Sequence, residues 1–316
     1  MSKHELLSFP VLSSSDLGAF LTTQGIDHTM SGPVNEFKGV AQLGRCDAHH
    51  LIWSKAMNDA VRETPARVVI LPRAAQSDCA GFADKTFVFV DNPREAFRVI
   101  LTRLFSRQYD TARGFFDQSM FIEVRPSVWI APSATVAQDV TMGENVVIHP
   151  GAIVYPNVTL GENVEICAGC IIGAPGFGHV RQADGTLEHF PHIGGVTIGD
   201  NVTIGSNTCV DSGGLSPTVI GNGCKIGNLT QIAHNVELEE NCLIGTRCQV
   251  AGGTKIGART EVWAGVTISN NRRIGKDCDI KIGSIVITHL PDGAVVSGNF
   301  AISHEKRLRQ FQEERL

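Results

Sequence analysis

The chain has 316 residues, of which 42% are hydrophobic and 19% charged, so it has the composition of an ordinary globular protein and the length for two domains. Its net charge of −5 gives no reason to expect nucleic acid or an anionic membrane as a partner. The chain has no run of about 18 apolar residues, and its first stretch, MSKHELLSFPVLSSSDL, lacks the apolar core of a signal peptide. We therefore expect a cytoplasmic protein with no transmembrane segment.

Residues 1 to about 120 contain alternating helix and strand patterns. The stretch SSSDLGAFLTTQG predicts a capped helix that ends at Gly25. ARVVILP and KTFVFVD are rich in β-branched and aromatic residues and predict strands. DNPREAFRVILTRLF predicts a second helix, with Asp91 or Asn92 as N-cap and Pro93 at the first helical position. Residues 1–120 are therefore expected to form a small α/β domain.

Beyond this region an aliphatic residue recurs at every sixth position. Gly often follows it, and a turn-former such as Asn is common shortly afterwards, as in IGDNVT. The pattern occurs in three runs, which are Ile130, Val136, Met142, Ile148, Val154, Leu160, Ile166 and Ile172; Ile198, Ile204 and Val210; and Ile220, Ile226, Ile232, Leu238, Ile244, Val250, Ile256, Val262, Ile268, Ile274, Ile280 and Val286.

A period of six matches neither the 3.6-residue turn of an α-helix nor the two-residue alternation of a strand. It is typical of the hexapeptide parallel β-helix, in which each hexad is one short strand and one turn and three hexads close a triangular coil of about 18 residues. We expect residues 121–298 to form seven to eight such coils. The aliphatic residue points inward, and a Val, Thr or Cys four places later is a second, smaller inward position.

The six-residue rhythm is interrupted twice. The stretch GAPGFGHVRQADGTLEHFPHIGGVT lies between Ile172 and Ile198, and four extra residues lie between Val210 and Ile220. Insertions in a solenoid leave it as loops on one face and often form the binding face. After these coils, residues 299–316 are polar and charged and predict a C-terminal helix.

The nine cysteines do not indicate a disulfide framework or a zinc site. Six lie in the repeat, mostly at one recurring position, which suits a small apolar filler. Cys167 and Cys170 form the only C-x2-C pair, and no second pair completes a tetrahedral site. Only His149, His234 and His289 occupy hexads, at very different heights, so we expect no metal site and no cofactor.

His234, in GNLTQIAHNV, is the third residue of its hexad and is expected at a turn, pointing outward. One and two coils further on, Gly252 and Asn270 are predicted to lie over it along the axis, with the glycine leaving open space beside the imidazole. Because the pKa of a histidine is near neutrality, His234 is a candidate general base. An incidental histidine on an exposed turn is the alternative.

Other side chains are predicted near His234. Asp211 lies 23 residues earlier, which is about one coil once four inserted residues are subtracted, so its carboxylate could stabilise the charged imidazole. A turn-capping aspartate is the alternative. His179, His189 and His192 lie in the long insertion, where they could line a cleft or be ordinary surface residues.

Several motifs resemble the UDP-3-O-acylglucosamine N-acyltransferase family of bacterial lipid A synthesis. They are DNPREAF, GAPGFG, IGDNVTIGSNTCVDSGGL, VIGNGCKIGNLTQIAHNV and VSGNFA, which together span nearly the whole chain. The resemblance implies a left-handed parallel β-helix and a homotrimer with active sites between subunits. It also implies transfer of a 3-hydroxyacyl chain from acyl carrier protein to the 2-amino group of a UDP-glucosamine derivative.

The resemblance assigns roles to individual residues. His234 matches the general base, and the backbone N–H of Gly252 is a candidate for oxyanion stabilisation. Trp53 falls where the family has an aromatic residue that stacks on uracil, which implies uridine binding by the first domain. Asn228 matches a recurrent Asn near the catalytic His. The loop near the sugar nucleotide is matched by Phe177 and Gly178.

The chain also departs from the family. Ser212 replaces an Arg, Asn271 replaces a second His on the acyl-donor side, a tyrosine expected after Trp53 is missing, and the family's Ser-Gly-x-Pro-Ala close reads SGNFA. Three functions therefore stay open: the family's own N-acyl transfer, transfer to a different nucleotide amino sugar with coenzyme A as a possible carrier, and a non-catalytic scaffold. The sequence does not give the acyl chain length.

Overall fold

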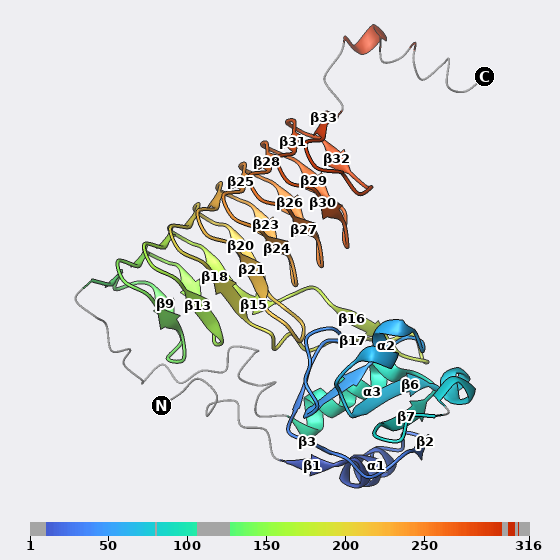
Figure 1. Cartoon of the computed structure of the whole chain (residues 1–316). Helices are drawn as coiled ribbons and strands as arrows, with labels where there is room; N and C mark the ends of the chain where they lie inside the picture. The colour runs from blue at the N-terminus through green and yellow to red at the C-terminus, as the bar shows by residue number, and fades with distance from the viewer. Residues whose placement is uncertain (1–10, 80, 106–126, 299–302, 307–308, 310–316) are drawn as a thin grey trace.

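The computed structural model describes residues 11–79, 81–105, 127–298, 303–306 and 309. Within these residues an α/β unit precedes a long solenoid of short parallel strands (Figure 1). The fold class predicted from the sequence is confirmed: the chain is mainly β, with a left-handed parallel β-helix after an α/β region.

Three parallel sheets form the sides of the solenoid. They have seven, nine and eight strands, close to the predicted coil number. The seven-stranded sheet contains β10 (Thr141–Met142), β13 (Val158–Leu160), β18 (Val196–Ile198), β21 (Thr218–Ile220), β24 (Glu237–Leu238), β27 (Lys255–Ile256) and β30 (Arg273–Ile274). The nine-stranded sheet contains β8 (Trp129–Ile130), β11 (Val147–Ile148), β14 (Glu165–Ile166), β19 (Thr203–Ile204), β22 (Lys225–Ile226), β25 (Leu243–Ile244), β28 (Glu261–Val262), β31 (Asp279–Ile280) and β33 (Val295–Val296). The eight-stranded sheet contains β9 (Thr135–Val136), β12 (Ile153–Val154), β15 (Ile171–Pro175), β20 (Cys209–Ser212), β23 (Gln231–Ile232), β26 (Gln249–Val250), β29 (Thr267–Ile268) and β32 (Ile285–Val286).

The strand register follows the sequence period. Ile226 pairs with Ile244, which lies 18 residues later, and Ile232 pairs in the same way with Val250. The aliphatic residues therefore stack into one buried column within each sheet, and most of those from Ile148 onward are almost fully buried. Cysteines and threonines fill the smaller inward positions, as predicted; Cys224 and Thr254 are examples. All nine cysteines are free thiols.

The α/β unit contains a five-stranded sheet in the order β2 (His28–Ser31), β7 (Thr86–Val90), β6 (Val68–Pro72), β5 (His50–Trp53) and β4 (Gly39–Val40). A short antiparallel pair, β1 (Leu12–Ser13) and β3 (Glu36–Phe37), lies beside it. The helical segments are α1 (Ser14–Thr23), α2 (Asp59–Glu63), the 3₁₀ turn η1 (Arg73–Cys79), α3 (Pro93–Val99) and the π-helical η2 (Ile100–Leu104). The predicted helices and strands of this region are confirmed; Asn92 is the N-cap of α3, and its side chain accepts from the Glu95 N–H.

The two insertions join the α/β unit to the solenoid. The longer one forms an antiparallel hairpin of β16 (His179–Arg181) and β17 (Leu187–His189), and its Phe190 packs in the apolar core of the α/β unit. The shorter one contains Ser216, whose hydroxyl donates to the side-chain oxygen of Gln42 in the α/β unit at 2.6 Å. Figure 1 shows the hairpin lying between the solenoid and the α/β unit. The face predicted to carry loops is therefore the face where another part of the chain docks.

The predicted C-terminal helix lies largely outside the described residues. His304–Lys306 and Arg309 are helical, and the rest of 299–316 is not described apart from Ser303. Among the helices of the described ranges, none has the length and apolar character that crossing a bilayer requires.

Candidate active site

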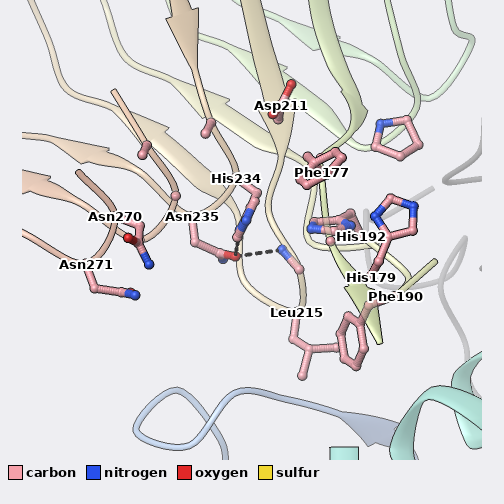
Figure 2. A pocket seen from close by; sticks show the side chains of 18 of the residues that line it. Phe177, His179, Phe190, His192, Asp211, Leu215, His234, Asn235, Asn270 and Asn271 are labelled. Carbon is pink, nitrogen blue, oxygen red and sulfur yellow. Dashed lines mark hydrogen bonds between the residues drawn. The ribbon is translucent and has the colours of Figure 1, made fainter. Parts of the chain in front are cut away.

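A pocket of about 1400 Å³ lies where the α/β unit, the long insertion and the solenoid meet (Figure 2). The α/β unit contributes Trp53 and Arg94, the insertion contributes His192, and the solenoid contributes His234 and Gly252. Residues that are far apart in the sequence thus share one cavity. The coil geometry had predicted this for His234 and Gly252.

His234 follows strand β23 and lies at a turn, with its imidazole outside the prism and in the pocket (Figure 2). Glycines make room for it on two sides. A Cβ atom on Gly252 would lie 2.6 Å from Nε2, and a Cβ on Gly176 would lie 2.9 Å from the Cβ of His234. Both distances are too short for a real side chain, so the glycines permit this ring position.

Asn235 determines which nitrogen of His234 carries the proton. Its Nδ2 donates to the Ser216 carbonyl at 2.8 Å, and its Oδ1 accepts from the backbone N–H of Gly214 at 2.9 Å, so the orientation of the amide is fixed. Nδ1 of His234 lies 3.2 Å from that same Oδ1. Since an amide oxygen can only accept, Nδ1 carries the hydrogen and Nε2 keeps its lone pair, facing the space over Gly252. This is the tautomer that a base acting through Nε2 needs.

His192 packs against His234 with the ring centroids 4.9 Å apart. It is almost fully buried, and its Nδ1 has no hydrogen-bond partner within the described part of the chain. Burial, with smaller contributions from His234 and His189, lowers the pKa of His192 to about 3. His192 is therefore neutral at physiological pH, and it packs against the His234 ring without adding a charge beside it.

Asp211 and His234 have different hydrogen-bond partners within the described residues, and the predicted approach of the carboxylate to the imidazole stays a prediction. Asp211 lines the same pocket, but the described partner of the imidazole Nδ1 is Asn235, and Asp211 hydrogen-bonds Gln231 instead. In the strand register Val210 pairs with Ile232, and Asp211 follows Val210 within β20. Burial raises the pKa of Asp211 to about 6, and the hydrogen bond to Gln231 partly offsets that rise.

Four other predicted binding residues, Trp53, Phe177, Gly178 and His179, do line the pocket. Trp53 is half-buried and packs against Phe97, with the ring centroids 6.4 Å apart. Phe177 is 88% exposed, and its ring lies 5.0 Å from that of His179. Gly178 lies against the His192 ring, which leaves no room for a Cβ there.

Asn271 and Asn228 differ in position. Asn271 lines the pocket, with its backbone N–H donating to the carbonyl of Gly252. Asn228 is not among the residues that line it, and its predicted binding role stays a prediction. The Oδ1 of Asn228 accepts from the Ser206 N–H at 2.8 Å, and Asn222 makes the same bond to Asp200 one hexad earlier. Asn228 therefore holds neighbouring turns together.

Ser212, where the resembling family has Arg, is buried and outside the pocket lining. Its hydroxyl accepts from the Gly195 N–H at 2.9 Å. Its one hydrogen faces two acceptors, the carbonyls of Gly213 at 3.2 Å and His192 at 3.3 Å. The Ser212 side chain thus links the two insertions by hydrogen bonds. An arginine at this position would have to bury its long cationic side chain between them.

Sequence reasoning missed Asn235, Gly176, Lys55 and Arg94 as pocket residues. Asn235 directly follows the histidine, and a turn asparagine carried no separate signal. Lys55 is two residues after Trp53, and Arg94 lies in the DNPREAF motif, so both stood next to segments already singled out. Within the described ranges, no group of three or more His, Cys, Asp or Glu residues could hold a metal ion.

Two family models match the repeat. "Bacterial transferase hexapeptide (six repeats)" matches residues 139–174, 217–252 and 237–270. "Hexapeptide repeat of succinyl-transferase" matches residues 195–228. Together they cover the solenoid around His234 and confirm the hexapeptide repeat.

Curated relatives are similar to part of the chain. A UDP-3-O-acylglucosamine N-acyltransferase of Ectopseudomonas mendocina is 40% identical over 124 residues, which is 39% of this chain and 30% of that protein. An enzyme of the same name from Pseudomonas fluorescens is 37% identical over 130 residues, or 41% of this chain and 32% of the relative. The resemblance inferred from the motifs is confirmed over this stretch, and the chain spans about a third of the length of the curated relatives it matches.

Among solved structures, a UDP-N-acetylglucosamine acyltransferase from Campylobacter jejuni is 24% identical with a TM-score of 0.44. It matches 58% of this chain and 83% of its own.

Proposed function

We propose that the protein is an N-acyltransferase that moves a 3-hydroxyacyl chain from an acyl carrier protein thioester to the amino group of a UDP-3-O-acylglucosamine-like sugar. The observation that carries this proposal is the His234 imidazole, held by Asn235 with its Nε2 lone pair facing the pocket. Similarity to proteins of that name over 124 and 130 residues supports the same activity.

In the proposed step Nε2 of His234 takes a proton from the sugar amine while the nitrogen attacks the thioester carbonyl. A C–N bond forms and the carbonyl oxygen becomes an oxyanion. The backbone N–H of Gly252, which has no acceptor among the described residues, is the candidate donor to that oxyanion. The C–S bond then breaks, and the departing thiolate takes the proton back from His234, so the base is regenerated.

The two ends of the substrate go to different parts of the pocket in this proposal. Trp53 stacks on the uracil ring, with its other side packed against Phe97. Phe177, Gly178 and His179 line the path of the sugar, and Asn271 lies toward the acyl-donor side. His192 acts through His234 rather than on the substrate, because it is almost fully buried.

We further propose that the active protein is a cytoplasmic homotrimer. Flat faces of a parallel β-helix are natural surfaces for association, and apolar side chains are exposed on two of the sheets, including Trp129, Leu243 and Ile285. A neighbouring subunit would turn the open pocket into an intersubunit groove. Light scattering on the purified protein tests this, and a monomer at micromolar concentration would contradict it.

The activity is tested with purified protein, UDP-3-O-acylglucosamine and 3-hydroxyacyl-acyl carrier protein, with products identified by mass spectrometry. We expect a UDP-diacylglucosamine product, and a fall of at least about 100-fold in rate for His234→Ala, since general-base catalysis contributes about 10²–10⁴. Parallel reactions with acyl-coenzyme A and with other UDP-amino sugars identify a related enzyme of different specificity. If the wild-type protein binds nucleotide but transfers nothing to any acceptor, the catalytic proposal is wrong and the scaffold function is favoured.

A further inference from the structure

The charges of the pocket are unevenly distributed. Of the described residues that line it, only Lys55 and Arg94 carry a permanent positive charge, and both come from the α/β unit. The only carboxylate in the lining is Asp211, on the solenoid strand β20. One side of the cavity is therefore cationic, and the side that holds His234 is not.

The two cations are not neutralised by nearby acids. None of the ion pairs between described residues involves Lys55 or Arg94, whereas the neighbouring acids Asp91 and Glu95 pair with Arg73 and Arg98. The guanidinium of Arg94 lies 5.2 Å from the centroid of the Phe190 ring, a cation–π contact that orients the side chain and leaves its charge uncompensated. Two uncompensated cations in a concave site attract an anion.

From this distribution we infer that Lys55 and Arg94 bind the diphosphate of a nucleoside diphosphate sugar. The inference rests on the proposed function and adds two specificity-determining residues to it. Lys55 follows Trp53 by two residues, and both side chains line the same pocket. The phosphates of a nucleoside diphosphate come directly after the ribose, and two negative charges there match two cations. The sugar then continues toward His234.

A structural role for Arg94 is the competing explanation, because its contact with Phe190 also ties the α/β unit to the insertion. The two roles differ in what they do to ligands without phosphate. A structural arginine affects uridine and UDP equally when it is removed. A phosphate-binding arginine affects UDP and leaves uridine nearly unchanged.

The test is isothermal titration of uridine, UMP and UDP into the full-length protein and its Lys55→Gln and Arg94→Gln variants. We expect each variant to weaken UDP binding about tenfold or more, because charge-assisted hydrogen bonds are lost, and to change uridine binding less than twofold. Arg94→Lys should recover part of the loss. Lys38→Gln, an exposed lysine of the same unit outside the pocket lining, is the matched control and should bind UDP normally.

Equal losses for uridine and UDP, or no loss for either, would overturn the inference. Thermal melting of each variant checks that the fold is retained. The measurement uses no acyl donor, so its result is separable from the activity. If the wild type transfers acyl chains and the variants bind UDP normally, only the diphosphate assignment fails. If the variants lose UDP selectively and no acyl transfer occurs, only the catalytic function fails.

Discussion

Nδ1 of His234 lies 3.2 Å from Oδ1 of Asn235, an oxygen that already accepts a hydrogen bond from the backbone N–H of Gly214. The residue next to the histidine in the sequence thus determines its tautomer. Asn235 can do so because it sits in a turn with φ of 59°, a left-handed conformation that asparagine tolerates better than most residues. The amide that shapes the turn also orients the candidate base.

Replacement of Asn235 by Asp should shift the pH dependence of acyl transfer. A carboxylate next to Nδ1 favours the imidazolium over the neutral ring. Because a protonated imidazole cannot accept the proton of the amine, the acid limb of kcat/KM should move to higher pH. The measurement is the pH–rate profile of the variant beside that of the wild type.

Asn241→Asp is the matched control for that variant, because Asn241 occupies the equivalent turn one hexad later, with φ of 57°, and does not line the pocket. It should leave the profile unchanged. A normal profile for Asn235→Asp would contradict the proposed pairing with His234.

The Gly252→Ala variant should displace the imidazole without unfolding the solenoid. Gly252 does not have a positive φ, so its backbone accepts alanine, but the added Cβ would lie 2.6 Å from Nε2 and 2.7 Å from Cε1 of His234. We expect kcat to fall at least tenfold with a change in Tm of only a few degrees, since small misplacements at a reacting centre are costly. Steady-state kinetics and thermal melting measure the two effects.

A double variant isolates this contact. In a His234→Ala background the imidazole is absent, so Gly252→Ala should reduce the residual rate no further. An additional tenfold loss there would indicate that the methyl group acts on the substrate or the backbone rather than on the ring.

The solenoid was predictable from sequence because its determinants are local and repeated. Each aliphatic residue faces the same position one coil away, so the six-residue spacing alone gave the pairing of Ile226 with Ile244. The stacking of Gly252 over His234 followed from the same arithmetic. Both depend on coil length and need no information about side-chain contacts.

The insertions limit that arithmetic. Subtracting the four inserted residues leaves about one coil between Asp211 and His234, and the pairing of Val210 with Ile232 agrees with that count, but the count does not determine where the two side chains point. The cationic side of the pocket was not predictable either, since Lys55 and Arg94 reach it only through the docking of the α/β unit on the hairpin. Tertiary contacts of that kind do not follow from a repeating pattern in the sequence.

His192 should make the stability of the protein depend on pH below neutrality. Its folded pKa of about 3 lies below the ordinary value of 6.5, so between these values the unfolded chain binds the extra proton and the folded chain does not. The free energy of unfolding therefore falls as the pH drops from 6.5 toward 3, by at most about 1.4 kcal/mol per pH unit from this group. Urea unfolding at pH 7.0, 6.0 and 5.0 measures the slope.

His192→Gln removes that titration and keeps a polar side chain of similar length. The variant should show a shallower loss of stability between pH 6.5 and 5 than the wild type. His149→Gln is the comparison, because His149 is half-exposed and pairs with Glu165 on the nine-stranded sheet. If the slopes of wild type and His192→Gln coincide, His192 is not the buried neutral imidazole that this geometry describes.

Ser212 provides the last prediction, which concerns the position where the resembling family has Arg. Ser212→Ala would leave the buried N–H of Gly195 without its acceptor, at a cost of about 1–3 kcal/mol in the free energy of unfolding. Ser212→Arg should cost more, because a guanidinium would have to be buried between the two insertions. Urea unfolding compares both with Ser206→Ala, whose hydroxyl lies in a turn outside this network and whose loss should cost less than about 0.5 kcal/mol. Restoring the family's arginine alone should therefore lower the free energy of unfolding, because the surrounding insertions fit a serine. An arginine variant as stable as the wild type would show that the site can hold the longer side chain.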